Sequence, residues 1–212
     1  MTACKSSVHT IGVTDKNKFQ DILEKSVLAL GAATSFALFG LVFYFSDRGL
    51  DLTDESFYLL WIIDPRAYTV HIPASLFGFV YHPLFRLVEG DVSMLRKFNL
   101  TFTLALAGLL SFQVLNRFWR TTLSHFLPLV IVAIATAATA LLSFDTWLLT
   151  PNYNTLAFQA ILISFLGMLS IDKKGPLGAL SGTVIGLGGW LAIMAKPTSA
   201  LGLGLAVLIY VV

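Results

Sequence analysis

The sequence predicts an all-α polytopic membrane protein, and three observations support this fold class. Of its 212 residues, 56% are hydrophobic and 12% are charged, whereas a soluble domain has roughly 45–50% apolar and about 25% charged residues. The mean hydropathy is +0.79. The apolar residues also gather in runs of nearly membrane-spanning length, separated by short polar segments. A net charge of +2 gives no basic surface of the kind that binds nucleic acid.

The first apolar run covers residues 26–46 and is long enough to cross about 30 Å of hydrocarbon. Residues 1–25 before it form a lysine-containing tail, and no small-residue cleavage pattern follows the run. We therefore expect a retained signal-anchor helix preceded by a cytoplasmic tail. A single cysteine, Cys4, excludes an internal disulfide and a cysteine-based metal site.

A mixed segment, residues 47–95, follows the first run and holds seven of the chain's 12 acidic residues. Its two apolar pieces, 57–63 and 74–88, are too short or too interrupted to cross a bilayer. Pro83 is expected to break the second piece. The segment is thus predicted to be a large outer loop whose short helices lie along the membrane surface.

Further spans are predicted after the loop, at residues 98–115, 126–144, 156–171, 177–195 and from 198 onward. Lysine and arginine mark the two short loops near 117–120 and 173–174, so these loops and the N-terminus are expected to be cytoplasmic. The outer loop and residues 145–154 then share the outer face. The last run has about 14 residues where a span needs about 20. We therefore expect residues 1–212 to be one domain with about six spans, the N-terminal portion of a longer protein.

Two adjacent acids, Asp54 and Glu55, open the apolar part of the outer loop. If Thr53 or Asp54 caps a helix there, the carboxylates lie in its first turn, where the helix dipole favours them. Asp54 and Tyr58 then share one face. A carboxylate in this place can act as a general base or bind a metal ion. A capped interfacial helix with solvated acids explains the same pattern.

Basic residues on the predicted outer face would suit a phosphate group. They are Arg66, His71, His82, Arg86, Arg96, Lys97 and Lys196. The alternative for each is a side chain that anchors its helix at headgroup level. The sequence contains no HExxH, P-loop or dinucleotide-binding motif.

The Asp-Glu-x-x-Tyr sequence at 54–58 and the Tyr-His-Pro sequence at 81–83 resemble a known family. They are similar to the polyprenyl-phosphate-sugar-dependent membrane glycosyltransferases of the GT-C fold, in the protein O-mannosyltransferase and aminoarabinose transferase branch. One proline follows His82, where members often have two. The resemblance implies that Asp54, with Glu55 beside it, is the base or organises the site. It also implies that His82 lies near the donor phosphate.

The resemblance implies further site residues along the chain. Asp145 resembles a further acid of some members, Asn152, Tyr153 and Asn154 follow it in the same loop, and Lys196 resembles the basic residues of the lipid-phosphate cavity. The expected catalytic residues are thus Asp54 and Glu55. The expected substrate-binding residues are Tyr58, His82, Arg86, Asn152, Tyr153, Asn154 and Lys196. No cofactor is identified, and Asp54 with Asp145 is where a divalent cation would bind.

The expected function is transfer of a sugar from a polyprenyl-phosphate donor to a lipid, glycan or protein acceptor. The reaction would take place on the outer face of the plasma (inner) membrane, among membrane lipids and without nucleic acid. Two alternatives stay open. A transporter or flippase of lipid-linked substrates would need charged or broken helices near the midplane, and a non-catalytic scaffold would tolerate replacement of Asp54.

Overall fold

The computed structural model describes residues 11–49, 54–66, 75–119, 126–144, 148–171 and 176–211. Within these ranges all regular structure is helical, which confirms the predicted all-α class. The elements are α1 (Ile11–Phe45), α2 (Asp54–Ile63), α3 (Phe77–Leu87), α4 (Val92–Phe118), α5 (Phe126–Ala137), the 3-10 helix η1 (Ala138–Phe144), α6 (Tyr153–Met168), α7 (Pro176–Ala195) and α8 (Pro197–Val211).

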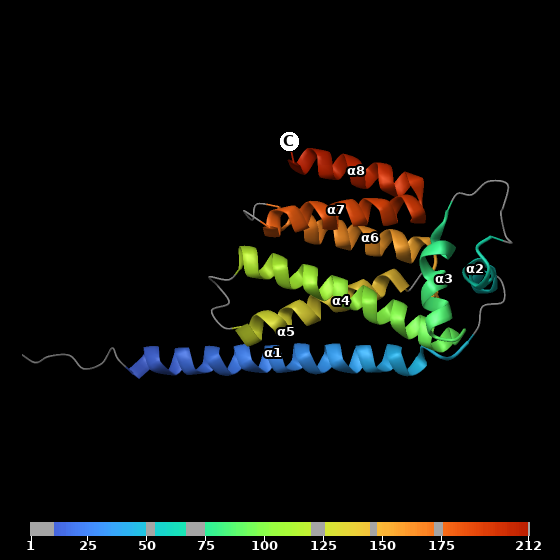
Figure 1. The fold of residues 1–212 in the computed structure, drawn as a ribbon. Coiled ribbons are helices and arrows are strands. Elements are labelled where there is room, and N and C mark those ends of the chain that lie inside the picture. Colours follow the sequence, from blue (N-terminus) through green and yellow to red (C-terminus); the bar gives the residue numbers. More distant parts are fainter. Residues whose placement is uncertain are drawn as a thin grey trace, which may run out of the picture.

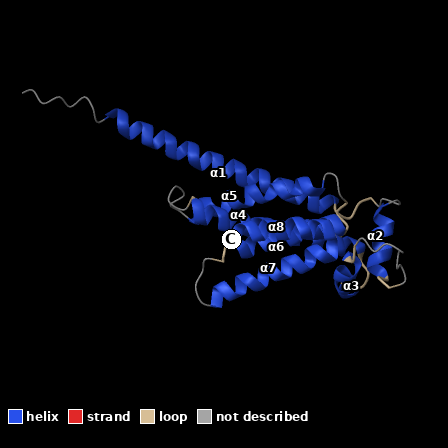
Figure 2. Cartoon of the chain, turned by 90° about the horizontal axis from the view of Figure 1, so that it is seen from above, coloured by secondary structure: helices blue, strands red, loops and turns tan. Residues whose placement is uncertain are grey.

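The long helices run side by side, and the short helices α2 and α3 lie at one end of this bundle (Figures 1 and 2). Four helical segments of the described chain are long and apolar enough to cross a membrane: Phe19–Phe45, Val92–Phe118, Phe126–Phe144 and Gly178–Ala195. Two shorter apolar helices, Tyr153–Met168 and Pro197–Tyr210, accompany them. The protein is therefore a helical membrane protein with four candidate spans.

The helix boundaries depart from the sequence prediction at several places; α6, for example, runs from Tyr153 to Met168 where residues 156–171 were predicted. Helix α1 begins at Ile11, so much of the predicted tail is helical, and the candidate span within it begins at Phe19. Helix α4 begins at Val92 and not near 98, because the Asp91 carboxylate caps it by accepting the backbone N–H groups of Ser93 and Met94. The predicted span 126–144 has the same limits in the structure, with its last part wound as the 3-10 helix η1.

The expectation that Pro83 breaks the second apolar piece is wrong. Helix α3 continues through Pro83 to Leu87. A proline removes the hydrogen bond to the carbonyl four residues before it, here that of Phe79. Both Pro83 and Phe79 are exposed, so the unpaired carbonyl belongs to the outer side of the helix, where solvent or lipid headgroups can satisfy it.

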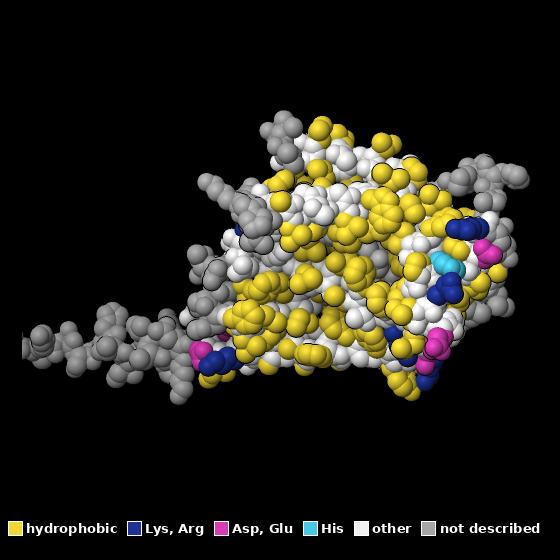
Figure 3. Space-filling model, viewed as in Figure 1, with side chains coloured by type: hydrophobic (Ala, Val, Ile, Leu, Met, Phe, Trp, Pro, Cys, Tyr) yellow, Lys and Arg dark blue, Asp and Glu magenta, His cyan; other side chains and the backbone are white. Residues whose placement is uncertain are grey.

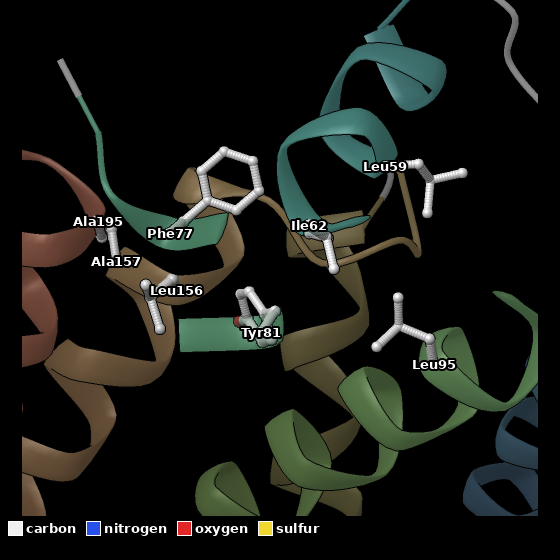
Figure 4. Close-up of a cluster of buried hydrophobic side chains, with 8 residues drawn as sticks. All are labelled: Leu59, Ile62, Phe77, Tyr81, Leu95, Leu156, Ala157 and Ala195. Carbon is white, nitrogen blue, oxygen red and sulfur yellow. The ribbon is translucent and has the colours of Figure 1, made fainter. Parts of the chain in front are cut away.

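A cluster of buried side chains fixes α2 and α3 to the end of the bundle (Figure 4). It consists of Leu59 and Ile62 from α2, Phe77 and Tyr81 from α3, Leu95 from α4, Leu156 and Ala157 from α6, and Ala195 from α7. Ile62, Phe77 and Leu95 are fully buried. Burying each such side chain stabilises the fold by roughly 1.5–3 kcal/mol. The two short helices are thus held in place by the bundle.

Close packing of α6 on α7 depends on one glycine from each helix. A Cβ atom on Gly188 would lie 2.8 Å from the carbonyl oxygen of Ala160, and one on Gly167 would lie 2.9 Å from that of Ser181. Small residues allow such backbone approach between membrane helices. By contrast, Gly186 has nothing within 4 Å of its added Cβ.

Gly78 forms the close contact between α2 and α3 and gives a first prediction. A Cβ atom there would meet the backbone carbonyl of Trp61, whose carbon atom would lie 3.0 Å away. Because the obstacle is backbone, it cannot rotate aside, and we expect Gly78→Ala to lower the free energy of unfolding by about 1–3 kcal/mol. Thermal unfolding of the purified protein measures the change. Gly186→Ala is the matched control, and equal melting temperatures for both variants would contradict the predicted contact.

Candidate functional site

The end of the bundle at α2 and α3 collects the residues that the sequence singled out. Helices α1 and α7 end there, and α4, α6 and α8 begin there (Figure 1). On the visible face, charged and histidine side chains gather at this end, while the flank of the bundle is mostly hydrophobic (Figure 3). This polar end is therefore the candidate site.

Asp54 is the first residue of α2, and its side chain is exposed. The N-terminus of a helix favours a negative charge, so this position stabilises the carboxylate. Tyr58 lies one turn further along the same helix. Burial is the main reason that the pKa of Tyr58 is raised well above its usual value, with further contributions from Tyr153 and the charge of Asp54. The Tyr58 hydroxyl therefore stays neutral and can donate a hydrogen bond.

Three aromatic rings, which we call the aromatic triad, come together next to Asp54: Tyr58 of α2, Phe77 of α3 and Tyr153 of α6. Their centroids are 5.8 Å apart for Tyr58 and Phe77, 5.8 Å for Tyr58 and Tyr153, and 6.3 Å for Phe77 and Tyr153. The ammonium nitrogen of Lys196 lies 5.2 Å from the Tyr153 centroid, a cation–π contact. The structure thus brings together Asp54, Tyr58, Tyr153 and Lys196 from separate parts of the chain.

Glu55 is buried and holds the start of α2, with Arg96 and Thr150 as partners. Glu55 is only 2% exposed. Its Oε1 accepts hydrogen bonds from Arg96 Nη2 at 2.5 Å, from Arg96 Nε at 2.9 Å and from the Thr150 hydroxyl. Arg96 also donates to the backbone carbonyls of Ser46 at 3.3 Å and Gly49 at 2.8 Å. These contacts, which we call the Arg96 hub, join the end of α1, the start of α2, α4 and the segment before α6.

The Arg96 hub corrects one expectation about the basic residues. Arg96 was expected to bind a phosphate or to anchor its helix at headgroup level. It is instead only 5% exposed and forms an ion pair with Glu55. Arg96 therefore holds the start of α2 in position through Glu55. The burial of Glu55 suits the same positioning task, and its part in catalysis stays a prediction.

A second buried polar network links α3, α4 and α6 beneath the site. Tyr81 donates to Gln159 Oε1 at 2.9 Å, and Gln159 Nε2 donates to Asn99 Oδ1 at 2.8 Å and Thr103 Oγ1 at 2.9 Å. Burial raises the pKa of Tyr81 more than its hydrogen bond to Gln159 lowers it, so the hydroxyl stays protonated. Sequence reasoning missed this network. Its signal was the presence of amide side chains inside otherwise apolar runs.

The histidine and arginine predicted on α3 occupy different surroundings. His82 Nδ1 lies 2.8 Å from the carbonyl oxygen of Ile62, and since a carbonyl can only accept, Nδ1 carries the proton in this bond. His82 therefore ties α3 to the last turns of α2. Arg86 lies one turn further along α3 and is exposed. Neither residue belongs to the aromatic triad.

The second outer loop supplies a helix cap and one site residue. Asn152 is 1% exposed, and its side chain caps α6 by accepting the N–H groups of Asn154 at 2.9 Å and Thr155 at 3.1 Å. This capping box places Tyr153 in the first turn of α6, in the aromatic triad. Asn154 is half-buried beside it.

One member of the predicted metal pair, Asp145, lies outside the described residues. Across the described ranges, no group of three or more histidine, cysteine, aspartate or glutamate side chains is arranged to hold a metal ion. A divalent cation at Asp54 and Asp145 stays a prediction.

Comparison with known proteins finds no matching family model, no matching curated protein and no matching solved structure. The fold and site define a helical membrane protein with a polar, aromatic-lined site at one end of its bundle.

Proposed function

We propose that this protein is a membrane glycosyltransferase that moves a sugar from a polyprenyl-phosphate carrier to an acceptor hydroxyl. In this proposal α6 and α8 join the four candidate spans to give six, in a GT-C-like arrangement. The N-terminus lies in the cytoplasm, and the polar end of the bundle lies on the outer face of the plasma membrane. The resemblance of residues 54–58 and 81–83 to that family supports the proposal.

One observation carries the proposal: an exposed carboxylate, Asp54, lies beside the aromatic triad, and the exposed ammonium group of Lys196 lies over one ring of that triad. The reaction needs these groups. The acceptor oxygen forms a bond to the anomeric carbon, the bond from that carbon to the phosphate oxygen breaks, and the polyprenyl phosphate leaves with the electron pair. Asp54 takes the proton of the acceptor hydroxyl. Direct displacement of this kind inverts the anomeric centre.

The cationic and hydroxyl groups stabilise the leaving phosphate in the proposal. Its negative charge grows as the bond breaks, and donors fixed at that point lower the barrier. Lys196 is exposed and oriented over the Tyr153 ring. Tyr58, kept neutral by burial, is a hydrogen-bond donor in the same place. His82 and Arg86 on α3 are the further basic groups assigned to the donor.

The test is turnover of a labelled donor by the full chain in membranes. Membranes with and without the protein receive radiolabelled polyprenyl-phosphate sugars of several kinds, and release or transfer of the sugar is measured. Protein-dependent turnover of at least one donor is expected. Protein-dependent movement of the labelled lipid between leaflets, with no sugar released from any donor, would contradict the proposal and favour a flippase.

Lys196 gives a prediction specific to the leaving phosphate. Lys196→Gln removes one charge-assisted hydrogen bond, so we expect kcat/KM to fall about tenfold or more. Lys25→Gln is the matched control, because Lys25 forms an exposed ion pair with Asp21 on α1. Lys196→Arg, which keeps the charge, should recover part of the loss. Equal kcat/KM for Lys196→Gln and Lys25→Gln would remove Lys196 from the mechanism.

A further inference from the structure

An apolar groove runs between the second half of α1 and η1, apart from the residues assigned to catalysis. Its volume is about 600 Å³, within the range of roughly 300–1,000 Å³ that ligand sites occupy. Its walls are formed by side chains such as Leu38, Leu41 and Phe45 of α1 and Leu141 and Leu142 of η1. Every lining residue is hydrophobic, so the occupant of the groove must be an apolar chain.

A cation, the guanidinium group of Arg48, lies over Phe45, one of the residues that line this groove. The Arg48 guanidinium carbon lies 4.9 Å from the ring centroid of Phe45, which lines the groove, and 4.7 Å from that of Tyr44. Arg48 Nη2 also donates to the Tyr44 hydroxyl at 2.9 Å. Stacking and this hydrogen bond orient the planar guanidinium in advance. Among the described residues Arg48 forms no ion pair with a carboxylate, and its side chain is exposed.

The position of Arg48, three residues after the end of α1, sets the depth of this cation. The candidate span in α1 ends at Phe45, and Arg48 follows it within one helical turn. A groove alongside the last turns of a span, with an arginine just beyond the span, lies at hydrocarbon depth along its wall and reaches headgroup depth near the arginine. This order of apolar wall and cation matches the order of acyl chain and phosphate in a phospholipid.

We propose that the groove binds one anionic phospholipid, with an acyl chain along the Leu38–Phe45 wall and the headgroup phosphate on Arg48. The charge of Arg48 selects an anionic over a zwitterionic headgroup, because a basic residue at the surface attracts net negative charge. The proposal does not depend on the glycosyltransferase assignment.

Competition between two lipids tests the site in the full chain. The purified protein is equilibrated with equimolar phosphatidylglycerol and phosphatidylcholine of matched acyl chains, and retained lipid is identified by native mass spectrometry. We expect one phosphatidylglycerol to be retained with a preference of about fivefold or more over phosphatidylcholine. Equal retention of the two lipids by the wild-type protein would overturn the proposal, whatever the variants do.

Variants locate the site. Arg48→Gln should bring the lipid preference close to one, while Arg117→Gln, an exposed arginine in the last turn of α4 that also lies over an aromatic ring, should leave it unchanged. Ala138→Phe, which fills the groove from η1, should lower retention of both lipids, with the melting temperature confirming that the variant is folded. Equal losses in Arg48→Gln and Arg117→Gln would show a general surface-charge effect and overturn the proposal.

Discussion

Replacement of Arg96 by methionine is expected to lower the free energy of unfolding by about 3–5 kcal/mol, the cost of breaking a buried ion pair from one side. Glu55 is only 2% exposed, and the Arg96 guanidinium donates two hydrogen bonds to its carboxylate. The substitution removes both bonds and leaves this buried charge without its partner. It also removes the donors to Ser46 and Gly49, so the start of α2 loses its attachment to α1. Thermal unfolding in detergent measures the effect.

A double variant separates the charge from the packing of the Arg96 hub. Glu55→Gln combined with Arg96→Met removes both charges, so the penalty of an uncompensated buried carboxylate disappears, and the double variant should be more stable than Arg96→Met alone. Lys97→Met, at the next position of α4, is the control for loss of one positive charge. A melting temperature for Arg96→Met equal to that of Lys97→Met would contradict the role of the hub.

Replacement of Asp54 by asparagine is expected to lower turnover of the labelled donor by about 10²- to 10⁴-fold, the usual contribution of a general base. Asparagine is nearly isosteric and is also favoured at helix starts, so α2 should keep its place. Donor binding and the melting temperature should therefore stay close to the wild-type values. Activity assays on membranes with matched protein levels measure the loss.

The matched control for Asp54 is Asp64→Asn. Asp64 is an exposed acid that follows the other end of α2, where its carboxylate accepts the N–H of Arg66 at 3.1 Å. We expect Asp64→Asn to keep wild-type turnover. Turnover by Asp54→Asn at the level of Asp64→Asn would remove Asp54 from the mechanism, even if the protein proves to be a transferase.

The fold class and most helices follow from composition and run length, because helices in lipid must be long and apolar. The span 126–144 is confirmed at both ends, and helices occur in both apolar pieces of the outer loop. The start of α4 could not be predicted from hydropathy alone, since the Asp91 cap sets it and not the apolar run. The continuous α3 depends on Pro83 lying on the exposed side of the helix, which tertiary packing decides.

The candidate site was predictable in part. Loop charges predicted one shared face for the outer loop, residues 145–154 and Lys196, and the structure places their described parts at the same end of the bundle (Figure 1). The contact of Tyr58 with Tyr153 depends on how the buried side chains of Ile62 and Phe77 position α2 and α3. Hydrophobic patterns do not specify such contacts. The pairing of Glu55 with Arg96, 41 residues apart, is of the same kind.

The Arg96 hub also sets an order of events during synthesis. Glu55 leaves the ribosome 41 residues before Arg96 and 95 residues before Thr150. At synthesis rates of about 5–20 residues per second, the last partner of this carboxylate follows it by roughly 5–20 s. Until α4 has been inserted, Glu55 must stay hydrated at the membrane surface. The Arg96 hub is therefore completed only after α1, α4 and α5 have been synthesised.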